Sequence, residues 1–89
     1  MQFNVAGFEH KFRRIARTLE LKEETGEAVV KYLFDLNANI NIPQKLRDIQ
    51  VQEKHIDTLA DLAFADFAHP NNPKPVSRAD FKQLYLTAL

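Results

Sequence analysis

Hydrophobic side chains recur at helical spacing along most of the chain, and the first such stretch predicts a helix from about Val5 to Leu19. Asn4 is the expected N-cap of this helix. The apolar stripe follows an i, i+4, i+7, i+8, i+11 pattern and consists of Phe8, Phe12, Ile15, Ala16 and Leu19. The opposite face carries His10, Arg13, Arg14 and Arg17. Glutamates follow this cationic face at once, so we interpret it as a solvated helix face.

A second helix is predicted from about Thr25 or Gly26 to Asn39, with Asn41 in the left-handed conformation that ends it. Its main stripe consists of Val29, Tyr32, Leu33, Leu36 and Ile40. Val30 and Phe34 form a second apolar pair on the flank of the same helix. Either a small bundle wraps the helix on both sides, or this pair meets a partner surface outside the chain.

Pro43 at a first helical position predicts a one- or two-turn helix in which Leu46 and Ile49 point inward. A longer helix follows from about Gln52 to Phe67. One face of it carries Ile56, Leu59, Ala60, Ala63 and Phe67. His55 lies beside this face without a second histidine or carboxylate at ligand spacing, which favours a hydrogen-bonded boundary residue over a metal ligand.

The segment from Ala68 to Ser77 contains three of the four prolines, which predicts an extended, stiff connection of the kind that positions something. Ser77 and Asp80 have the spacing of a capping box, and Val76 and Phe81 have that of a hydrophobic staple. The apolar face of the last helix continues through Leu84, Tyr85 and Ala88.

No segment shows the strict alternation of a half-buried strand, and no segment repeats another. The pattern therefore predicts an all-α fold, a small bundle of about four or five helices joined by short connections. At 89 residues the chain is expected to form a single domain, residues 1–89.

Composition removes several classes of function. Twelve basic residues balance twelve acidic ones, so no overall field draws the chain to nucleic acid or to an anionic membrane. There is no cysteine and no apolar run long enough for a membrane span or a signal peptide, so we expect a cytoplasmic protein. Two glycines cannot supply a phosphate-binding or dinucleotide-binding loop, and the three histidines include no spaced ligand pair. Taken alone, these residues do not describe an enzyme.

Four segments, in order, resemble the C-terminal helical part of the iron-containing, or group III, alcohol dehydrogenases. Residues 1–4, MQFN, resemble a family segment ending in Phe-Asn, and residues 8–19, FEHKFRRIARTL, resemble its ERYARIARAL helix. Residues 40–51, INIPQKLRDIQV, are similar to GIPxxLxxxGV. Residues 66–74, DFAHPNNPK, are similar to the DxCTxxNPR loop that precedes the final helix. The resemblance covers nearly all 89 positions.

Asn72 and Pro73 match the loop motif directly, whereas other positions depart from the family pattern. Asn41 and Gln50 stand where the family has glycine, Ala68 at its cysteine, His69 at its threonine and Lys74 at its arginine. At position 50 a residue other than glycine must therefore adopt the conformation of the turn. Lys74 keeps the positive charge of the family's arginine but lacks its planar guanidinium group. These changes suggest a divergent branch of the family and leave the fold assignment intact.

The resemblance implies a parent enzyme that is an NAD(P)-linked alcohol or aldehyde oxidoreductase holding a divalent iron. The family's iron ligands and its nicotinamide-binding domain belong to segments that precede the position matching Met1. No catalytic, metal or cofactor-binding residue is therefore expected in this chain, and His10, His55 and His69 inherit no ligand role. Because the family's loop approaches the catalytic cleft, Ala68 and His69 are the candidates for a substrate-pocket edge. The alternative is a structural loop that orients the last helix.

The main hypothesis is that the chain is the C-terminal helical fragment of an iron-dependent alcohol dehydrogenase, inactive by itself. Its expected partners are the missing N-terminal part of the parent enzyme or a second copy of itself. The alternative is a free-standing helical module that binds a protein partner through Val30 and Phe34. A third hypothesis is a small nucleic-acid binder that uses the basic face of the first helix.

Overall fold

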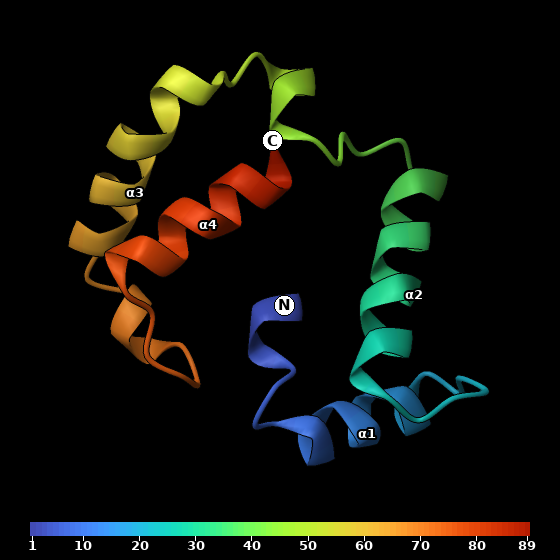
Figure 1. Ribbon diagram of the computed structural model, residues 1–89. Helices are drawn as coiled ribbons and strands as arrows, with labels where there is room; N and C mark the ends of the chain where they lie inside the picture. Colours follow the sequence, from blue (N-terminus) through green and yellow to red (C-terminus); the bar gives the residue numbers. More distant parts are fainter. The chain divides into compact units, whose positions relative to one another are not determined.

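Helices make up all the regular structure of the protein, as a computed structural model covering residues 1–89 shows (Figure 1). The residues divide into two units, residues 1–42 and residues 43–89. The α-helices are α1 (Glu9–Thr18) and α2 (Gly26–Asn39) in the first unit, and α3 (Ile56–Ala65) and α4 (Arg78–Ala88) in the second. Single 3-10 turns are η1 (Gln2–Asn4), η2 (Leu46–Ile49), η3 (Glu53–His55) and η4 (His69–Asn71). The predicted all-α class is confirmed, while a single domain over residues 1–89 stays a prediction.

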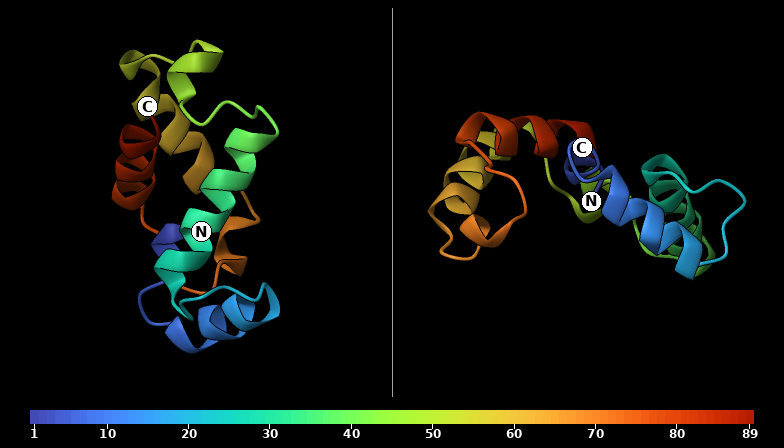
Figure 2. Two further views of the ribbon diagram at one scale, coloured as in Figure 1. Left: turned by 90° about the vertical axis from the view of Figure 1, so that its right-hand side faces the viewer. Right: turned by 90° about the horizontal axis from the view of Figure 1, so that it is seen from below.

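The core of the first unit lies where α1 crosses the N-terminal end of α2 (Figures 1 and 2). Phe12 and Ala16 of α1 and Val29 of α2 are buried there. Half-buried apolar residues surround them, namely Val5, Phe8, Leu21 and Leu33. Because α1 covers only one end of α2, Tyr32, Leu36 and Ile40 of the predicted α2 stripe remain exposed.

The start of α1 differs from the sequence prediction. The helix begins at Glu9 and not at Val5, and Asn4 is the last residue of η1 and not an N-cap. Gly7 has φ +89°, a conformation that interrupts the helical path before α1 can begin. The Glu9 carboxylate accepts the Gly7 N–H at 3.1 Å. Val5, outside the helix, packs against the first unit's core.

Gly26, the first residue of α2, is buried because the Val5 side chain lies directly over it. We expect Gly26→Ala to destabilise the first unit by about 1–3 kcal/mol, the usual cost of overpacking. A Cβ at this position would overlap Val5 Cγ1 and force the whole Val5 side chain to move. Helix propensity alone favours alanine, so the sign of the change separates the two effects.

Chemical denaturation of Gly26→Ala, followed by circular dichroism, measures this effect. Ala28→Gly, inside the same helix, is the control, since there propensity alone predicts a loss of about 1 kcal/mol. A Gly26→Ala variant more stable than the parent chain would show that Val5 does not pack tightly over Gly26.

The boundaries of α2 agree with the prediction, and its two ends explain why. Thr25 is the N-cap, and its hydroxyl oxygen accepts the Ala28 N–H at 3.1 Å. Asn41 has φ 59°, the left-handed conformation predicted for it. Gln50 has φ 67°, so a side chain other than glycine occupies the second left-handed turn as well.

The short helix after Pro43 is the single turn η2, which begins at Leu46 after an extended Lys45, so Pro43 is not its first residue. Leu46 is half-buried, as predicted, but Ile49 is 60% exposed. The turn ends at the left-handed Gln50, and no second helical turn follows that could place neighbours around Ile49. The prediction that Ile49 points inward was wrong.

In the second unit, α4 packs along α3, and Ile56 and Ala60 of α3 are buried there. The predicted helix from Gln52 to Phe67 is η3 followed by α3, which ends at Ala65. Asp66 is extended, and its carboxylate accepts the Ala68 N–H at 2.7 Å. Phe67 therefore leaves the apolar face and is 92% exposed, against the prediction.

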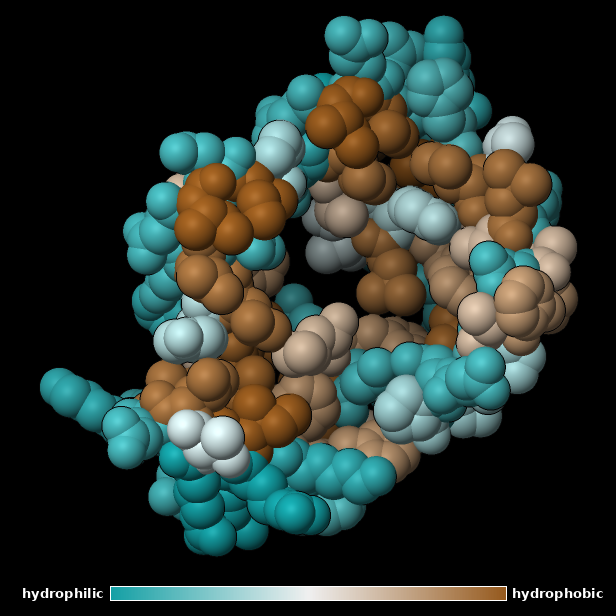
Figure 3. Space-filling model, turned by 180° about the vertical axis from the view of Figure 1, so that it is seen from behind, coloured by the Kyte–Doolittle hydropathy of each residue, from teal (hydrophilic) through white to brown (hydrophobic).

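Hydrophobic side chains also reach the surface in both units (Figure 3). The larger of them include Phe34 and Ile40 of α2 and Leu62 and Phe64 of α3. None of the helices has the length and apolar character needed to span a membrane.

Candidate functional site

The proline-containing loop between α3 and α4 is fixed by hydrogen bonds within itself. The Asn71 N–H donates to the Ala68 carbonyl and the Asn72 N–H to the His69 carbonyl, both at 3.0 Å, which forms η4. The Asn72 side-chain amide donates to the Lys74 carbonyl at 2.8 Å. Asn72, one of the two residues that match the family's loop motif, thus holds the backbone that leads into the final helix.

His69 joins this loop to both neighbouring helices. Its ring stacks on Phe64 of α3 with centroids 5.2 Å apart, and it meets Phe81 of α4 edge-on at 5.4 Å. The Nδ1 atom of His69 is buried and has no hydrogen-bond partner among the protein groups. A ring held on two sides in this way fixes the loop against α3 and α4.

A cavity of about 620 Å³ opens beside the loop in the second unit. Its walls come from the end of α3, the loop and one face of α4. The lining residues are Ala63, Asp66, Ala68, His69, Asn71, Asn72, Pro73, Phe81 and Tyr85. Ala68 and His69, the two candidates from sequence, therefore lie side by side in one cavity wall. Their assignment to the edge of a substrate pocket stays a prediction.

Sequence reasoning did not single out Asn71, Phe81 and Tyr85 as members of this cavity. Phe81 and Tyr85 lie one turn apart on α4, and this i, i+4 spacing was the available signal. Phe64, which contacts His69, carried no signal, because the sequence places it outside the predicted apolar face of its helix.

The first turn of α4 is closed by the capping box predicted at Ser77 and Asp80. The Ser77 hydroxyl oxygen accepts the Asp80 N–H at 3.1 Å, and the Ser77 N–H donates to the Asp80 carboxylate at 2.8 Å. The backbone and hydroxyl of Ser77 hold the pKa of Asp80 below its ordinary value. Val76 and Phe81 are both half-buried, and their contact as a hydrophobic staple stays a prediction.

Ion pairs also hold α3 and α4 together. Lys82 Nζ lies 2.8 Å from an Asp57 oxygen, and Arg78 pairs with both Asp57 and Asp61. Lys82, and then Arg78, hold the pKa of Asp57 below its ordinary value. Asp61 in turn raises the pKa of Arg78.

We expect the second unit to lose stability as the pH falls below about 4. The pKa values of Asp57 and Asp80 are lower in the folded chain than in the unfolded chain, so the unfolded state binds protons first as the pH falls. Their contribution is fully present above the unfolded value of about 3.9 and is lost as the pH falls through the folded values. Thermal melting from neutral pH down to about pH 2 measures the decline.

Asp57→Asn is the matched variant for this titration. It should be less stable than the parent chain at neutral pH, and its melting temperature should fall less between neutral and acid pH. An equal fall in both proteins would show that the pairing of Asp57 with Lys82 and Arg78 contributes nothing to the pH dependence.

The flank residues Val30 and Phe34 lie in the first unit, where they line a separate cavity of about 650 Å³ between α2 and the N-terminal segment. Phe34 is 51% exposed and Val30 is half-buried. The alternative that a bundle covers this flank is therefore not realised within the first unit.

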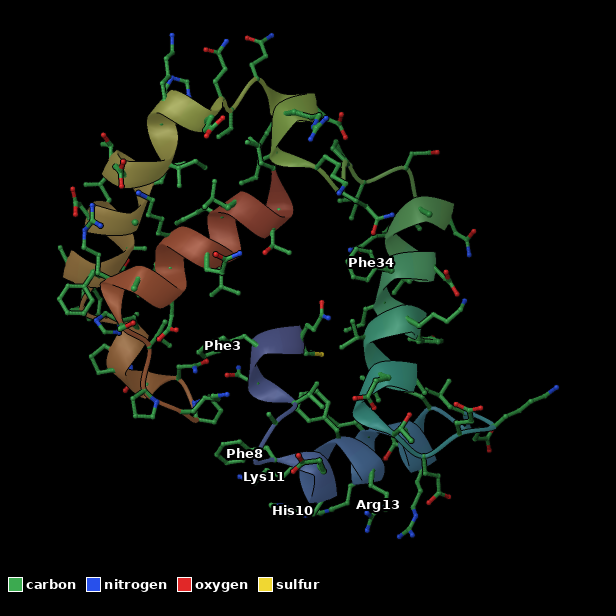
Figure 4. All side chains as sticks on the ribbon, in the orientation of Figure 1. Phe3, Phe8, His10, Lys11, Arg13 and Phe34 are labelled. Atoms are coloured by element: carbon green, nitrogen blue, oxygen red, sulfur yellow. The ribbon has the colours of Figure 1, made fainter.

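The basic face of α1 points away from α2, as His10 and Arg13 show in Figure 4. Arg17 pairs with Glu24 at 2.7 Å, and Lys11 lies over the Phe8 ring at 5.5 Å. These contacts agree with the interpretation of a solvated helix face.

The comparisons with known proteins give the family. The sequence profile of the Fe-containing alcohol dehydrogenase family, C-terminal part, matches residues 1–89. The chain therefore belongs to the iron-containing alcohol dehydrogenase family, as the resemblance indicated. It is 35% identical over 94 aligned positions to the lactaldehyde reductase of Escherichia coli K12, and the match covers 99% of this chain. It is 27% identical over 74 positions to the 4-hydroxybutyrate dehydrogenase of Cupriavidus necator, with 83% of this chain covered.

The chain spans about a quarter of the length of the first relative and about a fifth of the second, 25% and 19% respectively. It corresponds to one part of these enzymes.

Iron is the metal in the family's name, and the side chains of this chain do not form a site for it. No group of three or more histidine, cysteine, aspartate or glutamate side chains comes together. His10 is exposed on α1, and His69 is packed between two phenyl rings. His55 Nδ1 accepts the Gln52 N–H at 3.1 Å, which confirms it as a hydrogen-bonded boundary residue.

Proposed function

We propose that this chain is the C-terminal helical part of an iron-dependent alcohol dehydrogenase, an NAD(P)-linked oxidoreductase that acts on an alcohol or aldehyde in the cytoplasm. The observation that carries the proposal is the family profile, which matches the chain over its whole length, residues 1–89. The names of the two relatives, a reductase of lactaldehyde and a dehydrogenase of 4-hydroxybutyrate, support a small hydroxylated substrate or its aldehyde.

In this proposal the remainder of the parent enzyme binds iron and the nicotinamide cofactor, and the present chain supplies one wall of the substrate pocket. Ala68 and His69 form that wall. The His69 ring, held between Phe64 and Phe81, supports it and fixes the position of Ala68 beside it. At this wall the chain shapes the pocket and excludes water, and it performs no step of the hydride transfer.

The isolated chain is expected to be inactive. With ferrous iron, either nicotinamide cofactor and a series of small primary alcohols, it should give no alcohol-dependent cofactor reduction. A full-length member of the family serves as the positive control under the same conditions. Turnover by the purified 89-residue chain would overturn the proposal that the catalytic groups lie elsewhere.

A second candidate function is favoured by the exposed Phe34 and the cavity beside it: a helical module that binds a protein partner or a second copy of itself. Phe34→Asp should then make the chain more monodisperse in light scattering and leave its helix content unchanged. Loss of helix content in that variant would show instead that Phe34 is part of the first unit's core.

A further inference from the structure

The cavity of the first unit has an apolar floor and a polar rim. Val5 and Ala6 on one side and Val30 and Phe34 of α2 on the other form the floor. The rim consists of Gln2, Glu9, Glu27 and Lys31. In Figure 4, Phe34 projects from α2 on the side where the N-terminal segment lies. The most exposed aromatic ring of α2 thus points into a hollow of its own unit.

The cavity continues along α2. A second hollow of about 270 Å³ shares Gln2, Val30 and Phe34 with the first and adds Met1, Leu33 and Asn37. The two together follow α2 from Glu27 to Asn37, a length of about 15 Å at the rise of an α-helix. We call this combined hollow the α2 groove. Its length suits about three turns of a docked helix.

One wall of the α2 groove is anchored to α2 through Val5. Val5 is held on the first turn of α2 by its contact with Gly26, so the N-terminal segment lies at a set distance from the helix. Covering an apolar groove with another apolar surface removes both from water, which lowers the free energy of the system.

Two observations indicate what covers the α2 groove. The chain corresponds to a quarter of the length of the lactaldehyde reductase, and the matching profile describes the C-terminal part of the family. Met1 itself lines the groove, so the groove lies beside the N-terminal segment of this C-terminal part. The rim is acidic on balance, with Glu9 and Glu27 against Lys31, whose Nζ is bound by Asp35 at 2.6 Å.

We propose that the α2 groove is the docking site for an amphipathic helix of the parent enzyme that precedes Met1, with Phe34 between its apolar side chains. A basic residue of that helix faces Glu27. This inference rests on the proposed function, and it names the surface through which the chain joins the rest of the enzyme.

Cysteine labelling in a chimera tests the inference, because this chain has no cysteine of its own and the chimera without an introduced cysteine gives the background labelling of the reductase part. The chimera carries this chain in place of the matched quarter of the lactaldehyde reductase. Phe34→Cys reports on the groove, and Tyr32→Cys is the matched control on the opposite side of the same helix. Both positions should react readily with a maleimide in the isolated chain. In the chimera, Phe34→Cys should react at least about tenfold more slowly than in the isolated chain, because the maleimide reaches it only when the structure opens locally. Tyr32→Cys should remain reactive.

The outcomes separate the two proposals. An active parent chimera in which Phe34→Cys stays as reactive as Tyr32→Cys overturns the docking site and leaves the proposed function standing. A folded but inactive chimera in which Phe34→Cys is protected overturns the proposed function and leaves the docking site standing. Equal protection at both positions also overturns the α2 groove as the specific docking face.

A co-expression experiment keeps the inference falsifiable if the fused chimera does not fold. The 89-residue chain is produced together with a lactaldehyde reductase that lacks its matched quarter. The two should co-purify, Phe34→Asp should abolish co-purification, and Tyr32→Asp should not. Failure of the unmodified chain to co-purify overturns the inference, and so does an equal loss of co-purification with both variants. A second copy of the chain that occupies the groove would give the first of these results.

Discussion

Replacing Ile56 with alanine should destabilise the second unit by about 2–5 kcal/mol, the range for truncating a buried isoleucine. Ile56 is 2% exposed and is one of the two largest fully buried side chains of the chain. Ala60 is the only other buried hydrophobic residue of that unit, so little other buried side-chain surface stabilises its core. A protein of this size has a free energy of unfolding of about 5–10 kcal/mol, so the loss is a large fraction of the total.

Urea denaturation of Ile56→Ala against Leu62→Ala measures the effect. Leu62 belongs to the same helix but is 64% exposed, so its truncation should change the free energy of unfolding by no more than about 0.5 kcal/mol. Equal destabilisation by the two substitutions would contradict the placement of the core on the Ile56 side of α3.

Elements with local end signals could be predicted from the sequence. The start of α2 is predicted by the hydroxyl of Thr25 and its end by the tolerance of asparagine for positive φ, and both signals lie within the helix or next to it. The start of α4 is similar, because Ser77 and Asp80 cap each other across three residues.

Elements whose ends depend on contacts elsewhere could not be predicted in the same way. Val5 continues a helical pattern, but the positive φ of Gly7 separates it from α1 and its side chain packs over Gly26. Phe67 has the spacing of the α3 stripe, but the extended Asp66 ends the helix before it. In both cases the helical spacing of apolar residues continues past the true end of the helix. That spacing carries no information about the non-helical backbone of Gly7 or Asp66.

The candidate site was predictable in part for a related reason. Ala68 and His69 were found because they lie in a loop with a recognisable motif, and the structure places both beside one cavity. The packing of His69 between Phe64 and Phe81 joins residues from three elements, and no local pattern contains that information. The α2 groove was visible in the sequence only as the second apolar pair of α2.

The second large effect concerns activity. The chimera in which this chain replaces the matched quarter of the Escherichia coli lactaldehyde reductase should reduce lactaldehyde. The sequences are 35% identical over nearly the whole of this chain, and the loop at residues 66–74 keeps the Asn-Pro step that orients it. Substitution of His69 by threonine, the family's residue, should leave the chimera active and change its preference among small aldehydes, because the residue lies in the cavity wall.

The rate of lactaldehyde-dependent cofactor oxidation by this chimera is the most direct test of the family role proposed here. The chimera should turn over, whereas the same reductase without its matched quarter, and the 89-residue chain alone, should not. A folded chimera without lactaldehyde-dependent turnover, or a truncated reductase as active as the chimera, would contradict the proposal that this chain supplies a required part of the enzyme.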